Sequence, residues 1–164
     1  MAFARKDAEP TIGDMVVFED PKGTVMEVFK SPEPQKQAFR PNGIIPHKLG
    51  HVAFHVTDVQ GTTRFYCDVL GFRVSDWMGD HFSFLRCGVD HHTINLIETG
   101  SNKHFHTAFE LRDWAHMQTA CDFLSRNGYR MLWGLDVTVS VTISSPTIAA
   151  RTDLLPSCSR NSIR

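Results

Sequence analysis

The sequence predicts an α+β fold in which a βαβββ module is followed by a partial βαβ module, the two forming an open cleft. Two observations predict this arrangement. A short motif occurs twice, and each copy is followed by a stretch with helical spacing of apolar residues. After the first copy, three segments bounded by turn signals show the alternation or clustering of apolar residues that is typical of strands.

The repeat consists of residues 51–58 and 106–113, which both read His-x-Ala-Phe-x-(Val/Leu)-x-Asp and begin 55 residues apart. Each copy predicts a strand that ends at Asp58 or Asp113. Both aspartates suit a helix N-cap, because a carboxylate accepts hydrogen bonds from backbone N–H groups that have no partner within the helix. The repeat therefore predicts two related modules that pair about a pseudo-two-fold axis.

The predicted helices follow these caps directly. Apolar residues recur at i, i+3 or i+4 and i+7 over residues 59–70 and 114–124. Gly71 and Gly128 suit the left-handed position that follows a helix. The three segments after the first helix predict strands over residues 72–78, 82–87 and 93–98.

These elements divide the chain into three regions. Residues 1–46 are predicted to hold a β-hairpin, the remnant of a preceding module, and a stiff Pro-rich connector. Residues 47–134 form the catalytic-type domain, with one module over 47–100 and a partial module over 101–134. Residues 135–164 are an aberrant tail, because the repeated pattern stops at about Gly134 and a Val-, Thr- and Ser-rich stretch follows.

Composition narrows the classes of partner. The 164 residues carry a formal net charge of -1 and a pI near 6.7, so neither nucleic acid nor an anionic membrane surface is an expected partner. No apolar stretch approaches the length of a membrane span. Four scattered cysteines favour reduced thiols. We therefore expect a cytoplasmic protein that binds a small molecule and forms a homo-oligomer.

Two of the nine histidines, His51 and His106, stand at equivalent positions of the repeat. A single strand histidine is usually a core or surface residue, but two at equivalent places can converge where paired modules meet. Neutral imidazole is the commonest metal ligand. Two imidazoles and one carboxylate on one face form the open-sided site that suits Fe(II) oxygen chemistry.

Several motifs carry a family resemblance. Residues 65–72 read Phe-Tyr-x-x-Val-Leu-Gly-Phe, residues 85–88 read Leu-Arg-Cys-Gly, and residues 91–93 read His-His-Thr. With the segments 48–54 and 105–110, they resemble the extradiol ring-cleaving dioxygenase branch of the vicinal oxygen chelate superfamily, which also contains glyoxalases and bleomycin resistance proteins. The resemblance covers residues 48–134, and the last two motifs are the more specific to the ring-cleaving branch.

The resemblance implies a function and assigns roles. His51 and His106 correspond to two iron ligands, His92 to a neighbouring histidine that handles a proton and bound oxygen, and His91 to its lower-ranked partner. The implied cofactor is Fe(II), with Mn(II) as the alternative metal. The implied substrates are O2 and a catechol-like aromatic diol, as in the breakdown of aromatic compounds. A neutral-range pKa is expected for His92, which would let it receive and return the substrate proton.

The sequence departs from the family pattern at the third ligand, a glutamate that should follow an Asp-Pro-x-Gly turn near the C-terminus. No such segment follows Gly134. A shifted reading of the codons from about Leu135 permits a family-like ending, with the lost glutamate across the codons of Pro156 and Ser157. We therefore hypothesise a frameshift, genetic or from sequencing, which the DNA would decide. We expect an incomplete and impaired copy, exposed apolar surface where the last strands should lie, and poor stability.

Two carboxylates could substitute for the missing ligand. Glu27 could do so if the N-terminal hairpin docked in the cleft. Glu110 shares a strand face with His106 by period two, although a structural role is favoured.

Two other functions remain open. One is a glyoxalase-like metal isomerase or lyase, against which His92 argues. The other is a metal-free binding protein of the bleomycin-resistance type, which His51 and His106 disfavour.

Overall fold

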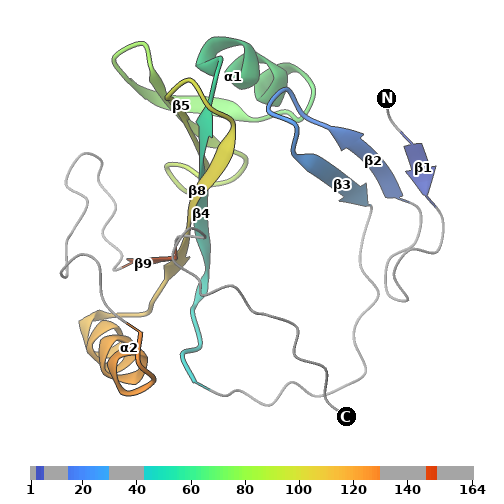
Figure 1. The fold of residues 1–164 in the computed structure, drawn as a ribbon. Helices are drawn as coiled ribbons and strands as arrows, with labels where there is room; N and C mark the ends of the chain where they lie inside the picture. The colour runs from blue at the N-terminus through green and yellow to red at the C-terminus, as the bar shows by residue number, and fades with distance from the viewer. Residues whose placement is uncertain (1–2, 6–14, 30–42, 130–146, 151–164) are drawn as a thin grey trace.

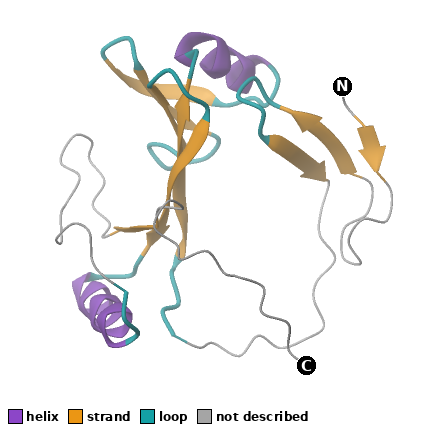
Figure 2. Cartoon of the chain, viewed as in Figure 1, coloured by secondary structure: helices purple, strands orange, loops and turns teal. Residues whose placement is uncertain are grey.

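The computed structural model describes residues 3–5, 15–29, 43–129 and 147–150, the first and last of these as backbone only (Figure 1). The described residues form two sheets and two helices (Figure 2). The first sheet is antiparallel and contains β1 (Phe3–Arg5), β2 (Met15–Glu19) and β3 (Val25–Phe29) in that order. The second sheet has six strands in the order β5-β6-β7-β4-β8-β9. The predicted α+β class is confirmed.

The second sheet contains all four strands of the βαβββ module. The elements along the chain are β4 (Lys48–Val56), α1 (Val59–Asp68), β5 (Arg73–Met78), β6 (Phe82–Arg86), β7 (Ile94–Glu98), β8 (Lys103–Glu110), α2 (Trp114–Arg126) and β9 (Thr147–Ala150). β4 lies between β7, to which it is parallel, and β8, to which it is antiparallel. The two strands that contain most of the repeated motif, β4 and β8, are therefore neighbours in one sheet.

Both helix starts follow the predicted chemistry. The Asp58 carboxylate accepts from the backbone N–H of Gly61 at 2.8 Å, and the Asp113 carboxylate accepts from that of His116 at 2.7 Å. Gly128 has a φ of 80° and directly follows the last residue of the α2 cap, as predicted. Gly71 is also left-handed, at 73°, but the C-cap of α1 is Val69, so this glycine lies one position later than expected.

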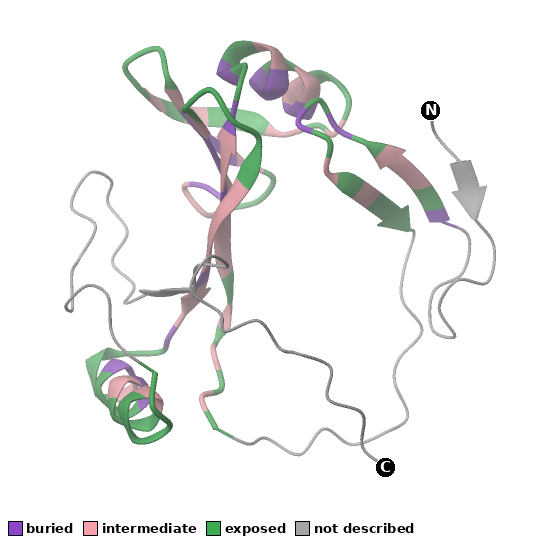
Figure 3. Cartoon of the chain, viewed as in Figure 1, coloured by how far each residue is buried: buried purple, intermediate pink, exposed green. Residues whose placement is uncertain are grey.

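The larger core lies between α1 and one face of the sheet (Figure 3). Its fully buried members come from the helix, from β6 and β7 and from the end of β4, and they are Val56, Val59, Tyr66, Leu85 and Leu96. Side chains alternate in direction along β6, with Ser83 and Leu85 facing the helix and Phe82, Phe84 and Arg86 facing the opposite side. A smaller cluster of Leu111, Met117 and Ala120 holds α2.

The N-terminal hairpin attaches to α1 through its turn. Lys22 donates hydrogen bonds to Asp20 and, at 2.8 Å, to the Tyr66 hydroxyl, which in turn donates to Asp20 at 2.8 Å. The Lys22 ammonium also lies 4.1 Å from the centre of the Phe54 ring. Because Tyr66 and Phe54 belong to the core on the α1 side of the sheet, the hairpin docks on that side.

Part of the tail predicted to be aberrant contributes a strand. β9 pairs antiparallel with β8, with Ala149 opposite Ala108. The other residues of the tail, on which the frameshift hypothesis and the missing ligand depend, lie outside the described residues, as does most of the Pro-rich connector. Neither described helix is long and apolar enough to cross a membrane.

Candidate metal centre

The β4–β8 ladder brings the two repeat histidines together. Ala108 of β8 lies opposite His51, and Ala53 of β4 lies opposite His106, so both imidazoles project from the same face of the sheet. Their Nε2 atoms are 2.8 Å apart and their ring centres 5.0 Å apart. Both opposing alanines are fully buried, and their small side chains leave the space above the sheet to the imidazoles.

Burial keeps the first of these imidazoles neutral. The pKa of His51 is lowered to about 3, mainly by burial and to a smaller extent by the nearby His92 and His106. A neutral imidazole has a nitrogen lone pair that can bind a metal. Two nitrogens that bind one ion at about 2.1 Å are roughly 3 Å apart when they subtend a right angle. The spacing and chemistry of this pair therefore fit two positions of a divalent transition metal ion.

His92 stands beside this pair on the segment between β6 and β7. Its ring centre is 4.6 Å from that of His51 and 5.2 Å from that of Phe84, and only 6% of the residue is exposed. The Nδ1 atoms of His92 and His91 are 3.0 Å apart. One nitrogen of His92 is thus engaged by His91.

The expectation of a neutral-range pKa for His92 was wrong, because the pKa is lower. Burial lowers the pKa of His92 to about 4, with smaller contributions in the same direction from His91 and His106 and an opposing one from Asp90. The sequence showed the position of this histidine but not the depth of its burial. His92 is therefore uncharged at pH 7, where one of its ring nitrogens can accept a proton and the other carries an N–H.

The structure brings neither candidate carboxylate into a metal-binding group. Glu110 Oε2 lies 3.5 Å from the Lys48 ammonium, in keeping with the structural role favoured for it. Glu27 is exposed on β3, in the hairpin that docks on the α1 side of the sheet. Within residues 15–29 and 43–129, no three His, Cys, Asp or Glu side chains form a group that could hold a metal ion.

Two features near the histidines were not predicted from the sequence. Lys48 donates to Asp90 at 2.6 Å and thereby ties the segment that carries His91 and His92 to the start of β4. Asn95 of β7 lies opposite both Ala53 and Phe84, so it shares the histidine face of the sheet. It is 4% exposed, and its buried Oδ1 has no hydrogen-bond partner among the described residues. The sequence could have indicated the role of Asn95, because a polar amide stands between the apolar residues Ile94 and Leu96 of a predicted strand. No sequence pattern could have indicated the contact between Lys48 and Asp90.

Comparison with known proteins gives relatives in two enzyme classes. The chain is 28% identical to metapyrocatechase 2 from Cupriavidus necator over 149 residues, which are 77% of this chain and 47% of that protein. It is 37% identical to the iron-dependent extradiol dioxygenase of Rhodococcus jostii (strain RHA1) over 75 residues, which are 41% of this chain and 24% of that enzyme. The chain thus spans less than half the length of these relatives.

A solved structure shares the fold over most of this chain. The Mn(II)-bound glyoxalase from Novosphingobium aromaticivorans superposes with a TM-score of 0.69 at 30% identity, over 81% of this chain and 44% of the glyoxalase. The family model of the Glyoxalase/Bleomycin resistance protein/Dioxygenase superfamily matches residues 48–144, the region of both repeats and of all the histidines described above. The chain therefore belongs to the Glyoxalase/Bleomycin resistance protein/Dioxygenase superfamily.

Proposed function

We propose that this chain carries part of an extradiol-type dioxygenase site, which cleaves a catechol-like aromatic diol with O2 at a single Fe(II) ion. The observation that carries this proposal is the 2.8 Å separation of the His51 and His106 Nε2 atoms on one face of the sheet. The names of the two curated relatives, one an iron-dependent extradiol dioxygenase, favour ring cleavage over other reactions of the superfamily.

Each histidine has a role in this proposal. His51 and His106 would hold the metal ion through Nε2. When bound, Fe(II) supplies a Lewis-acid centre at which the adjacent oxygens of a diol can meet O2. His92 is neutral and close to His51, so it could accept the proton of a diol hydroxyl at the nitrogen that does not face His91. His91 would hold the orientation of the His92 ring.

The surroundings of the site suit this chemistry. The pKa values of about 3 and 4 keep His51 and His92 uncharged at neutral pH, so that a metal cation meets no repulsion there. The Phe84 ring packs on both His91 and His92 and limits water on that side. With two imidazoles as the only described ligands, we expect Fe(II) to bind more weakly than it does in a site with a third, carboxylate ligand.

An anaerobic Fe(II) titration tests the proposal. The full chain should take up one equivalent of Fe(II), and His51→Ala and His106→Ala should each lower the affinity by roughly tenfold or more, as loss of half of a two-ligand set implies. The control is His81→Ala, which removes an exposed histidine from the turn between β5 and β6. After addition of catechol and air, a yellow ring-cleavage product should form, slowly if the site is impaired.

The same titration distinguishes the two other functions. A glyoxalase-like isomerase or lyase is favoured by the 30% identity to the Mn(II)-bound glyoxalase, and it would bind metal without cleaving catechol. A metal-free binding protein would show no metal uptake that depends on His51 or His106. Either result would overturn the dioxygenase proposal.

A further inference from the structure

Two arginines face each other across β5 and β6. Arg73 and Arg86 are direct partners in the antiparallel register, so their side chains leave the same face of the sheet side by side. Like charges in this position repel each other and destabilise a strand pair. An arrangement of this kind is therefore costly unless an anion lies between the two guanidinium groups.

No carboxylate neutralises either arginine within the described part of the chain. The ion pairs there involve Lys22, Lys48 and His81, and neither Arg73 nor Arg86 takes part in one. The Nε of Arg86 is buried and has no hydrogen-bond partner among these residues. A buried N–H group without an acceptor is unfavourable. An oxygen atom of a bound anion could accept a hydrogen bond from this group.

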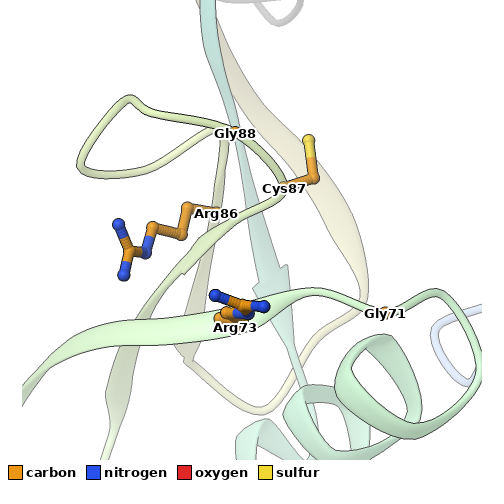
Figure 4. Close-up of a pocket in the computed structure, with 5 residues that line it drawn as sticks. All are labelled: Gly71, Arg73, Arg86, Cys87 and Gly88. Atoms are coloured by element: carbon orange, nitrogen blue, oxygen red, sulfur yellow. The ribbon is translucent and has the colours of Figure 1, made fainter.

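The two arginines line one depression of about 270 Å³, together with Gly71, Cys87 and Gly88 (Figure 4). The glycines place no side chain in this space, so it stays open between the end of α1 and the start of the β6–β7 segment. Its size suits a small anion and not a macromolecule. Guanidinium groups bind planar oxyanions through two parallel hydrogen bonds, which makes carboxylate or phosphate the matching chemistry.

The depression opens on the same face of the sheet as the histidines. Arg86 follows Phe84 by two residues on β6, and Phe84 packs against His92. Two residues along a strand span roughly 7 Å, so one small molecule could reach from the arginines toward the Phe84 ring.

We propose that Arg73 and Arg86 form an oxyanion site that binds the carboxylate or phosphate group of a small molecule. Anion binding by the two arginines does not require the metal centre. This proposal can therefore be tested independently of the proposed ring cleavage. A carboxylate would come from an aromatic acid whose ring lies toward Phe84, whereas a phosphate would come from inorganic phosphate or a phosphate ester.

Binding of benzoate, acetate and inorganic phosphate to the metal-free full chain tests this proposal. Isothermal titration and thermal melting are carried out at constant ionic strength, with sodium chloride as the reference salt. At least one of the three anions should bind saturably to the wild-type protein and raise its melting temperature. Tighter binding of benzoate than of acetate identifies an aromatic acid as the source, and binding of phosphate alone identifies a phosphate.

Matched variants assign the binding to the arginine pair. Arg73→Gln and Arg86→Gln should each weaken binding at least tenfold, while Arg64→Gln, at an exposed arginine of α1 on the other side of the sheet, should leave it within twofold. Arg86→Lys keeps the charge but loses the paired N–H groups, so it should also weaken binding. It serves in place of Arg86→Gln if that variant does not fold.

Without anion, Arg73→Gln should melt no lower than the wild type, because it relieves a like-charge pair. The proposal is overturned if none of the anions acts beyond sodium chloride, or if Arg64→Gln weakens binding as much as the paired arginines.

Discussion

The two helices of the described residues follow the same motif and start at the same kind of aspartate cap, yet they differ in how much of their surface is packed. α1 packs on β5, β6 and β7, three strands of its own module, with Val59 and Tyr66 fully buried. The hairpin turn also contacts α1, through the Tyr66 hydroxyl. α2 buries only Met117 and Ala120, against Leu111 and partly buried neighbours. Figure 3 shows this contrast: α2 is mostly exposed, whereas α1 carries several buried positions.

The difference shows that a repeated local pattern does not determine how much support each copy receives. The cap and the apolar spacing are properties of about fifteen residues, whereas most helix stability comes from packing on other elements. The metal candidates lie on the ladder between the two regions, one on β4 and one on β8. The position of His51 therefore depends on the well-packed region, and that of His106 on the strand that leads into the weaker one.

The largest expected effect comes from the buried charges that join the hairpin to α1. Lys22→Met leaves the Asp20 carboxylate, whose side chain is 0% exposed, without its cation. A buried ion pair that loses one partner typically costs about 3–5 kcal/mol. We expect a loss of this size in the free energy of unfolding, measured by urea denaturation with tryptophan fluorescence.

The double variant Asp20→Asn, Lys22→Met is the control for this prediction. It removes both charges, so it should recover part of the stability that the single variant loses. A single-variant loss below about 1 kcal/mol would mean that the hairpin does not hold α1 through this contact.

The next largest loss of stability should come from truncating buried side chains, and it should differ between the cluster under α1 and the cluster that holds α2. Leu96→Ala removes a fully buried side chain under α1 and should lower the free energy of the main unfolding transition by about 3 kcal/mol. Met117→Ala acts in the small cluster and should open α2 alone, which raises amide hydrogen exchange over residues 114–126. If both variants shift one shared transition equally, the two regions unfold as a single unit and the contrast drawn above is wrong.

The sequence predicted the first region well because its signals are local and agree with one another. The strand alternation, the Asp58 cap and the left-handed Gly71 all specify the same βαβββ order, and the predicted bounds of β5, β6 and β7 agree with the structure to within a residue. Gly71 shows the limit of such signals, since the exact end of α1 depends on how Val69 and its neighbours settle on the sheet.

The candidate site was predicted in part, and the missing parts have a physical reason. Equivalent positions in a repeat are enough to bring His51 and His106 together, because paired modules place equivalent strands side by side. The low pKa of His92 depends on burial among residues that the fold brings together, such as His51 of β4, which no local pattern encodes. The Arg73–Arg86 pairing depends on the strand register, which a bulge between Val74 and Asp76 shifts.

The helix caps should show the same contrast between regions at a smaller scale. Asp113→Ala removes the carboxylate that accepts from the His116 N–H and should cost about 1 kcal/mol of helix stability. In α1 the equivalent change, Asp58→Ala, leaves Glu98, which accepts from the Val59 N–H at 2.9 Å. We therefore expect more loss of helical circular dichroism from Asp113→Ala. An equal loss from Asp58→Ala would show that Glu98 and the core give α1 no extra protection.

The smallest effect on the free energy of unfolding should come from breaking the ion pair between Lys48 and Asp90, near the candidate metal centre. The side chains of Lys48 and Asp90 are 37% and 40% exposed, so Lys48→Met should change the free energy of unfolding by less than about 1 kcal/mol, and less at high salt. Its effect should be local instead, because Lys48 ties the segment that carries His92 to the first strand. In NMR relaxation, Lys48→Met should increase the mobility of residues 88–92, while the control Lys103→Met on β8 should not. Unchanged mobility would mean that packing against Phe84 alone fixes the His92 ring.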